Sequence, residues 1–385
     1  MNTLREQFSK GDEVLVCRNC ISGRSEKLFF QNDILSEVLE TDEHDGQLLK
    51  APGLIDLQIN GINGIDFNLA AITEENIANA TSYLLSQGVT SFFPTVITNS
   101  DENIINILET INNACKTDPL IDECVPGIHL EGPFISPAEG ARGAHDEKYI
   151  KPPDWELFEK FQKAAGGKIK IITLTPEWKG SQTFIEKCRR NGVIVSIGHS
   201  AANTTQIENA IKAGASLSTH LGNGVPLFIK RHPNLLWDQL AADDLYTCII
   251  ADGIHLPDSF IKVIMKVKGK KMLVVSDSTC FAGMPPGEYK NHIGGDIILD
   301  AENRVSMKSS PGILAGAGKS LLQNVETLTN HKLTDLCGAW QLASTNVADM
   351  LASQDAAFKK PNKDYVIFQF GGNEISVRKV IKNGR

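Results

Sequence analysis

The chain has 385 residues, of which 42% are hydrophobic and 22% charged, and its formal net charge is −8. These proportions are those of a globular protein, and the acidic balance argues against broad nucleic-acid binding, which needs a basic face. A few local cations can still receive a small anionic substrate. No window approaches the roughly 18 apolar residues that span a membrane. We therefore expect a cytoplasmic protein without nucleic-acid or membrane partners.

Residues 1–52 begin the chain with short apolar runs separated by turns, which is typical of β-structure. Cys17 and Cys20 form a lone Cys-x-x-Cys within them. A metal or redox role for this pair stays open, but no second pair and no helix start accompany it, which favours a strand that happens to carry two cysteines. The eight cysteines show no regular spacing of the kind seen in disulfide-rich proteins, so we expect reduced, buried thiols.

Residues 53–352 alternate between short β-branched-rich runs and segments with helical spacing. The helical segments include residues 73–88 and 204–214, each ending near a glycine. The eight strand-like runs are, in order, "GLIDLQIN", "VTSFFPTV", "VPGIHLEG", "KIKIITLTPE", "GVIVSIGHS", "ASLSTHLGN", "LYTCIIADG" and "KMLVVSDS". This alternation predicts an α/β protein with a (β/α)8, TIM-like barrel. A dinucleotide fold is disfavoured, because "NGING" replaces Gly-x-Gly-x-x-Gly after the first strand.

Two further segments do not follow the strand–helix alternation. Residues 353–385 read as strands and turns like residues 1–52, so we expect both chain ends to meet in a small β-domain beside the barrel. A hairpin-like insertion, "GGDIILDAENRVSM", follows the eighth strand. It could either join that domain or lie over the barrel mouth.

Polar side chains gather where the predicted barrel strands end, which is where barrel enzymes place their functional groups. The residues concerned are His129, Glu131, Glu177, His199, His220, Asn223, Asp252, His255 and Asp277. Any single strand-end histidine is more often a hydrogen-bonded structural residue than a ligand. Their joint placement favours a functional site.

Glu131, His199 and His220 together supply a carboxylate and two imidazoles, the ligands of a catalytic divalent metal that keeps one position open. A bound metal makes hydroxide available near neutral pH, and hydrolysis then also needs a base that returns the proton. Asp277 ends an apolar strand, where an aspartate is costly unless charge or metal stands nearby. We predict that it is this base, with capping of the following turn as the alternative.

Eight motifs in order, "PGLIDLQINGINGIDF", "HLEGPFIS", "GAH", "GHS", "THLGNG", "ADGIH", "VSDS" and "LAGAG", cover most of the chain. Through them the chain resembles the N-acetylglucosamine-6-phosphate deacetylase family of the amidohydrolase superfamily. The resemblance implies hydrolysis of the N-acetyl group of N-acetylglucosamine 6-phosphate to glucosamine 6-phosphate and acetate. It also implies a homodimer and a β-sandwich built from both chain ends.

Position by position, the resemblance implies that Glu131, His199 and His220 hold one divalent metal ion. Zinc is the first expectation, with iron, manganese and cobalt as alternatives. Asp277 would act as general base and then acid, and His145 would polarise the acetyl carbonyl. The residues implied to contact substrate are Ala144, His145, Asn223, Gly224, Arg231, His255, Leu314, Ala315 and Gly316.

The chain departs from the family pattern at two places. Asn223 is followed by Gly224 and Val225 where the family has Ala-Met, and Asp277 is followed by Ser-Thr rather than Ala. Deacetylation of another N-acyl amino sugar, either the galactosamine epimer or an unphosphorylated one, therefore stays as the alternative. A non-catalytic sugar-binding barrel is the alternative of a different class.

Gln58 and Asn60 stand at the end of the first strand, where many metal-dependent hydrolases carry two histidines one residue apart. An amide oxygen is a poor zinc ligand compared with imidazole. The pair therefore predicts one metal rather than two, with the amides hydrogen-bonding at the pocket floor near Asp56 or the bound water.

Overall fold

The computed structural model describes residues 13–43, 47–291, 295–359 and 363–385. Eight parallel strands form its central sheet, and their spatial order, β14-β13-β12-β11-β10-β9-β8-β5, follows the chain. All eight predicted barrel strands are confirmed. They are β5 (Leu54–Ile59), β8 (Val89–Ile97), β9 (Ile128–Glu131), β10 (Ile169–Leu174), β11 (Ile194–Ile197), β12 (Ala215–Ser218), β13 (Tyr246–Ile250) and β14 (Met272–Val275).

Hydrogen bonds between the first and last strands bring the two edges of this sheet together. The backbone N–H of Ser276 donates to the Asp56 carboxylate at 3.1 Å, and that of Asp277 donates to the Gln58 carbonyl at 2.9 Å. The sheet is thus a nearly closed barrel, and the carboxyl ends of all eight strands share one rim.

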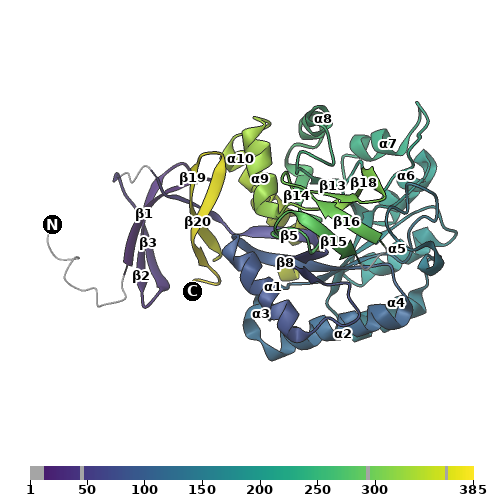
Figure 1. Ribbon diagram of the computed structural model, residues 1–385, viewed down its shortest axis with the longest axis horizontal. Helices are drawn as coiled ribbons and strands as arrows, with labels where there is room; N and C mark the ends of the chain where they lie inside the picture. Colours follow the sequence, from purple (N-terminus) through teal and green to yellow (C-terminus); the bar gives the residue numbers. More distant parts are fainter. Residues whose placement is uncertain (1–12, 44–46, 292–294, 360–362) are drawn as a thin grey trace.

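Helices surround the barrel (Figure 1). In α1 the Thr73 side chain caps the first turn, and buried Ile77, Ala80 and Leu84 form the stripe that packs inward. The α-helices are α1 (Glu74–Ser86), α2 (Asp101–Thr117), α3 (Pro119–Cys124), α4 (Trp155–Ala164), α5 (Ser181–Arg190), α6 (Thr204–Ala213), α7 (Leu235–Ala241), α8 (Asp258–Lys268), α9 (Leu321–Asn330), α10 (Leu336–Leu342) and α11 (Thr345–Gln354). Across the described residues, no helix is long and apolar enough to cross a membrane.

Strands from both chain ends form a second sheet at one end of the molecule (Figure 1). Its order is β20-β19-β4-β1-β2-β3, with β1 (Glu13–Asn19), β2 (Ser25–Gln31), β3 (Ile34–Glu40), β4 (Leu49–Pro52), β19 (Tyr365–Gly371) and β20 (Glu374–Ile381). Lys379 of β20 pairs with Glu13 of β1 at 3.1 Å and with Asp33 at 2.9 Å, so the sheet bends back on itself. The predicted β-rich domain from both ends is confirmed.

The expectation that every cysteine is a reduced thiol is wrong for two of the eight. Cys20, just after β1, forms a disulfide with Cys337 of α10, which joins the chain-end sheet to a barrel helix. The partners are 317 positions apart, so only the fold brings them together and no local spacing reveals the pair. Cys17 is a buried free thiol, so the Cys-x-x-Cys motif is not a disulfide.

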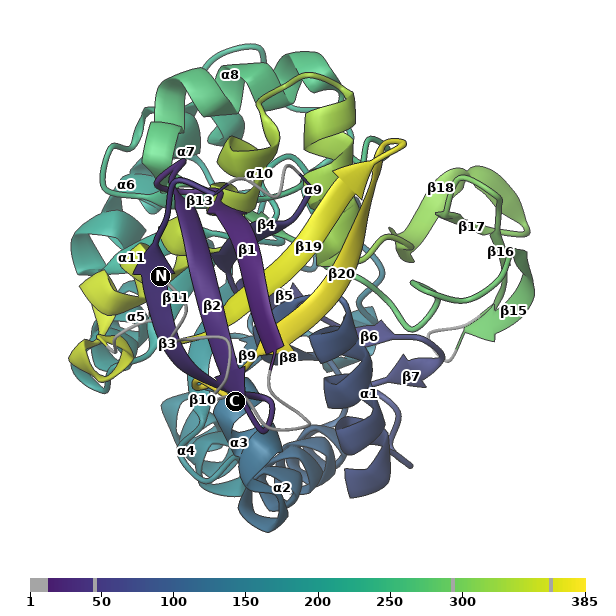
Figure 2. The same cartoon turned by 90° about the vertical axis from the view of Figure 1, so that its left-hand side faces the viewer.

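The insertion after the eighth strand forms an antiparallel sheet of its own. Its strands are β15 (Gly287–Asn291), β16 (Gly295–Leu299), β17 (Arg304–Met307) and β18 (Ser310–Ala317), and Figure 2 shows them apart from β19 and β20. The Thr279 N–H donates to the Ala317 carbonyl at 2.9 Å. The insertion is therefore fastened to the barrel rim beside Asp277 rather than to the chain-end domain.

Candidate active site

Three predicted ligand residues meet at the rim of the barrel, each from a different strand. Glu131 ends β9, while His199 and His220 lie just beyond β11 and β12. Each histidine Nε2 lies 3.2 Å from Glu131 Oε1, and the two Nε2 atoms are 3.1 Å apart. All three side chains are buried, with exposed fractions of 3%, 7% and 3%.

The hydrogen bonds of His199 show what this cluster can hold. Its Nδ1 lies 2.9 Å from the Ala141 carbonyl, which only accepts, so Nδ1 donates there and Nε2 of a neutral ring is available to bind a cation. This Nε2 faces the Glu131 oxygen and His220 Nε2, an arrangement that a shared cation stabilises. Tetrahedral zinc with bonds of about 2.0–2.1 Å sets its ligand atoms about 3.3 Å apart. The observed 3.1–3.2 Å spacing fits such an ion.

The backbone at these positions is itself unusual. His199, His220 and Asp277 have φ values of 46°, 26° and 48°, in the left-handed region that residues other than glycine rarely adopt. Such conformations are unfavourable and persist where the surrounding structure imposes them, often at functional sites. The ends of β11, β12 and β14 thus share the same backbone conformation at the residue that carries the site's side chain.

Asp277 lies beside the cluster, and the amides of Gln58 in β5 and of Asn60 just after this strand position it. Gln58 Nε2 donates to Asp277 Oδ1 at 3.0 Å and to Glu131 Oε1 at 2.8 Å, and Asn60 Nδ2 donates to Asp277 Oδ1 at 2.8 Å. The prediction that these amides make hydrogen bonds at the site is confirmed, and their partners are the two carboxylates. Burial raises the pKa of Asp277 to about 6.

Two further histidines flank the site. The ring of His145 lies against that of His199, with centroids 4.4 Å apart, and burial lowers the pKa of His145 to about 3, which keeps it neutral. His255 Nδ1 lies 2.7 Å from Asp252 Oδ2. Burial opposes ionisation of Asp252, but hydrogen bonds from His255 hold the pKa of that carboxyl below its usual value. Asp252 thus orients His255, a role its strand-end position alone did not reveal.

The other two polar strand ends are structural. His129 is bound on both ring nitrogens, to the Leu57 carbonyl at 3.0 Å and to Thr173 Oγ1 at 2.7 Å. Glu177 accepts from the Ala201 N–H at 2.7 Å and from Ser136 Oγ at 3.2 Å. Neither joins the metal-type cluster. Both are hydrogen-bonded structural residues, which is the more common role of a polar residue at a strand end.

Comparison with known proteins agrees with this geometry. Residues 49–304 match the model of the Amidohydrolase family. N-acetylglucosamine-6-phosphate deacetylase of Bacillus subtilis is 35% identical over 310 residues, which are 79% of this chain and 76% of the relative. For that of Lysinibacillus sphaericus the identity is 33% over 325 residues, with coverages of 82% and 81%. This chain belongs to the N-acetylglucosamine-6-phosphate deacetylase family of amidohydrolases.

The fold of the family is shared in full. The crystal structure of N-acetylglucosamine-6-phosphate deacetylase from Pasteurella multocida matches with a TM-score of 0.82 and 25% identity, over 97% of this chain and 98% of that one. As a member of the family, the chain is a hydrolase that acts on amide bonds.

The structure shows fewer contacts for the residues that the resemblance assigns to substrate binding than for the buried cluster. Asn223 Nδ2 donates to the His220 carbonyl at 3.3 Å, which ties it to the cluster. Gly316 of β18 lies against Thr279, two residues from Asp277, and Leu314 and Ala315 are half-buried on the same strand. Ala144 and Arg231 are exposed. In this family member the buried cluster is assembled, whereas Arg231 is only presented on a surface loop.

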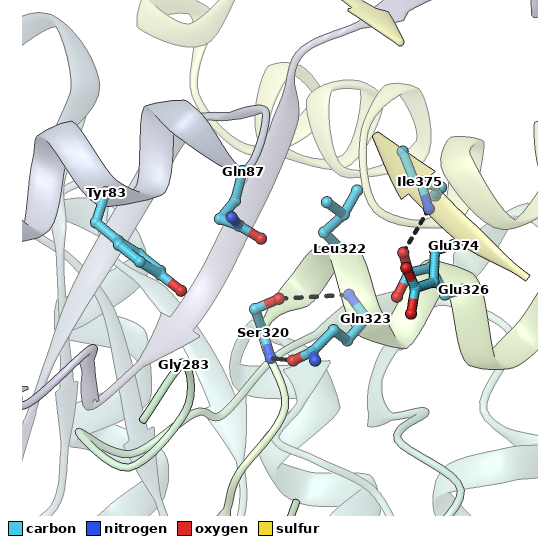
Figure 3. A pocket seen from close by; sticks show the side chains of 9 residues that line it. All are labelled: Tyr83, Gln87, Gly283, Ser320, Leu322, Gln323, Glu326, Glu374 and Ile375. Atoms are coloured by element: carbon cyan, nitrogen blue, oxygen red, sulfur yellow. Dashed lines mark hydrogen bonds between the residues drawn. The ribbon is translucent and has the colours of Figure 1, made fainter. Parts of the chain in front are cut away.

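A separate hollow of about 200 Å³ lies between α1, α9 and the start of β20 (Figure 3). Tyr83, Ser320 and Gln323 line it together with Glu326, which accepts from the Ile375 N–H at 2.6 Å. It shares no residue with the cluster around Glu131. This hollow is therefore distinct from the candidate active site.

Proposed function

We propose that this chain hydrolyses the N-acetyl group of N-acetylglucosamine 6-phosphate, releasing acetate and glucosamine 6-phosphate, with one divalent metal ion held by Glu131, His199 and His220. The observation that carries the proposal is the convergence of three candidate ligand atoms at 3.1–3.2 Å beside Asp277. When bound, the metal supplies an activated water and charge stabilisation for the amide carbonyl. The names of the relatives support the substrate class.

In the proposed mechanism Asp277 moves the proton. Gln58 and Asn60 both donate to its Oδ1, which fixes the carboxylate and leaves Oδ2 to take a proton from water and return it to the departing amine. Burial raises the pKa of Asp277 above that of an exposed aspartate, which favours a group that must both take and return a proton. Neutral His145 would donate a hydrogen bond to the acetyl oxygen, where negative charge develops.

Lys230, Arg231 and His255 are proposed to receive the phosphate. The first two lie on the loop of residues 222–234, called here the mouth loop, and are exposed. Asp252 holds Nδ1 of His255 and so leaves Nε2 for a ligand. Charge-assisted hydrogen bonds to phosphate are stronger than neutral ones, so these three side chains would favour a phosphorylated sugar.

We further propose zinc as the bound metal and a homodimer as the assembly. Nitrogen and carboxylate ligands with tetrahedral spacing suit zinc, and iron, manganese and cobalt accept the same set. The mouth loop presents Leu227 and Phe228 with exposed fractions of 82% and 94%. Large apolar side chains this exposed are typical of association surfaces. Replacing both with serine should shift the mass measured by light scattering to that of a monomer, and an unchanged dimer mass would place the interface elsewhere.

The proposal is tested by acetate release over a panel of N-acetyl sugars, glucosamine and galactosamine epimers, each with and without a 6-phosphate. We expect the highest kcat/KM for N-acetylglucosamine 6-phosphate and loss of activity after chelation, restored by zinc. Higher activity on a galactosamine or unphosphorylated sugar would replace the substrate and keep the chemistry. A protein purified without chelators that holds no metal and releases no acetate from any sugar would favour a sugar-binding barrel.

A further inference from the structure

Ser276 directly precedes the proposed base, Asp277, and its side chain is fully buried where β14 meets β5. The Ser276 hydroxyl accepts from the Ser278 N–H at 3.1 Å and donates to the Gln58 carbonyl at 3.3 Å. The carboxylate of Asp56 is a second acceptor for the same hydroxyl. Both acceptors belong to β5, so either bond ties Ser276 to that strand.

The bond from the Ser278 N–H spans the base and closes a turn that serine side chains form with the backbone two residues on. Asp277 lies in the middle of this turn with a φ of 48°, which is unfavourable for a residue other than glycine. Ser276 Oγ gives the Ser278 N–H a buried acceptor and so stabilises the turn. The direction in which the Asp277 side chain leaves the backbone depends on that turn.

The bond to β5 acts on the residue that orients the base. Gln58 Nε2 donates to Asp277 Oδ1 at 3.0 Å, and the Gln58 carbonyl accepts from the Asp277 N–H at 2.9 Å. The Ser276 hydroxyl therefore contacts the turn that carries the base and the strand that carries the bridging amide. The Ser276 N–H, which donates to Asp56 at 3.1 Å, would remain when the side chain is replaced.

We infer that Ser276 is a positioning residue that holds the Asp277 carboxylate against the amides of Gln58 and Asn60. It acts through Asp277 and is neither a proposed metal ligand nor a proposed substrate contact. The inference rests on the proposed function, in which Asp277 moves the proton, and adds a residue to which neither the strand-end pattern nor the resemblance assigned a role. Loss of the hydroxyl would loosen the turn and slow proton transfer, while the metal ligands and substrate contacts stay in place.

The experiment compares Ser276→Ala with the conservative Ser276→Thr and with a control, Ser278→Ala. Ser278 is also fully buried beside β5, and its hydroxyl donates to the Gly61 carbonyl at 2.8 Å, but this bond does not span the base. Alanine after the aspartate also agrees with the family pattern. The measurements are kcat and KM for acetate release from N-acetylglucosamine 6-phosphate, zinc content and melting temperature.

We expect kcat to fall about tenfold in Ser276→Ala with KM and zinc content unchanged, because a misplaced reacting group slows the reaction without weakening binding. Ser276→Thr keeps the hydroxyl, so its kcat should stay within about twofold of wild type, as should that of Ser278→Ala. Both alanine variants should lower the melting temperature by a similar few degrees, since each loses one buried hydrogen bond. If Ser276→Ala does not fold, Ser276→Cys against Ser276→Thr gives the same comparison, because a thiol is a weak hydrogen-bonding group.

Equal kcat values for Ser276→Ala and Ser278→Ala would overturn the positioning role while leaving the proposed function intact. A Ser276→Thr variant as slow as Ser276→Ala would also overturn it, as would a loss of zinc or a raised KM in Ser276→Ala. A wild-type protein that holds zinc but releases no acetate from N-acetylglucosamine 6-phosphate would instead overturn the proposed function, and the role of Ser276 with it.

Discussion

The strand-end cluster and the mouth loop serve the same proposed site but are held in very different ways. Glu131 and His220 are each only 3% exposed, and each has hydrogen-bond or ligand-atom neighbours within about 3 Å. Arg231 and Phe228 lie on a surface loop, the latter 94% exposed. The difference teaches that the proposed chemistry depends on buried geometry, whereas the proposed substrate choice depends on exposed side chains whose replacement hardly disturbs the fold.

The largest expected loss of turnover is at the proposed general base, Asp277, in the strand-end cluster. Asp277→Asn keeps the shape and the amide contacts but removes proton transfer, which is worth about 10²–10⁴-fold in rate. Turnover should therefore be nearly abolished while zinc stoichiometry stays at one per chain, measured by steady-state kinetics and elemental analysis. Near wild-type kcat in this variant would exclude Asp277 as the base.

A smaller loss is expected from the bridging amide. Gln58→Leu removes the N–H group that donates to both Glu131 and Asp277, which leaves two neighbouring carboxylates without a shared donor. We expect kcat to fall roughly 10–100-fold, in line with about 1.5–3 kcal/mol for a hydrogen bond to a charged group. Asn60→Ala is the matched control, because it removes a donor from Asp277 alone and should cost less. Equal losses would mean that the bridge to Glu131 contributes nothing.

The mouth loop should affect KM rather than kcat. Arg231→Ala is expected to raise KM for a 6-phosphorylated sugar about tenfold or more, since a charge-assisted hydrogen bond contributes about 1.5–3 kcal/mol. KM for the unphosphorylated sugar should not change. A parallel rise for both sugars would show that Arg231 does not recognise the phosphate.

The smallest effect is expected at the neighbouring lysine. Lys230→Ala removes a flexible ammonium group, whereas Arg231→Ala removes a planar guanidinium that can donate two hydrogen bonds to one phosphate. KM for the phosphorylated sugar should therefore rise only about two- to threefold in Lys230→Ala. The ratio of the two KM changes thus measures how specific the recognition is. A larger change for Lys230→Ala than for Arg231→Ala would reverse their assigned importance.

The sequence alone predicts the barrel and the cluster, because both follow from local patterns. Each apolar run ends in its polar residue, and parallel strands necessarily bring those ends to one rim. The distances within the rim depend on closure between β5 and β14, which no single segment encodes. The two acceptors of Gln58, on β9 and after β14, become neighbours only once that seam forms.

Other features depend on tertiary contact in the same way. Ser276 and Gln58 are 218 positions apart, and only the folded barrel brings the hydroxyl of one to the carbonyl of the other. The left-handed backbone at His199, His220 and Asp277 is likewise imposed by surroundings rather than by residue type. Glu177 and His129 show the converse, since a strand-end pattern cannot tell a satisfied structural side chain from a ligand.

The bond between Cys20 and Cys337 makes most of this chain a covalent ring, since the two cysteines are 317 positions apart. The whole circuit of eight strands belongs to that ring. A single protease cut within it leaves two pieces that still migrate as one band without reductant and separate once the bond is reduced. A nicked molecule would thus keep every strand of its barrel tethered, and its rim residues could reassemble without finding a lost fragment.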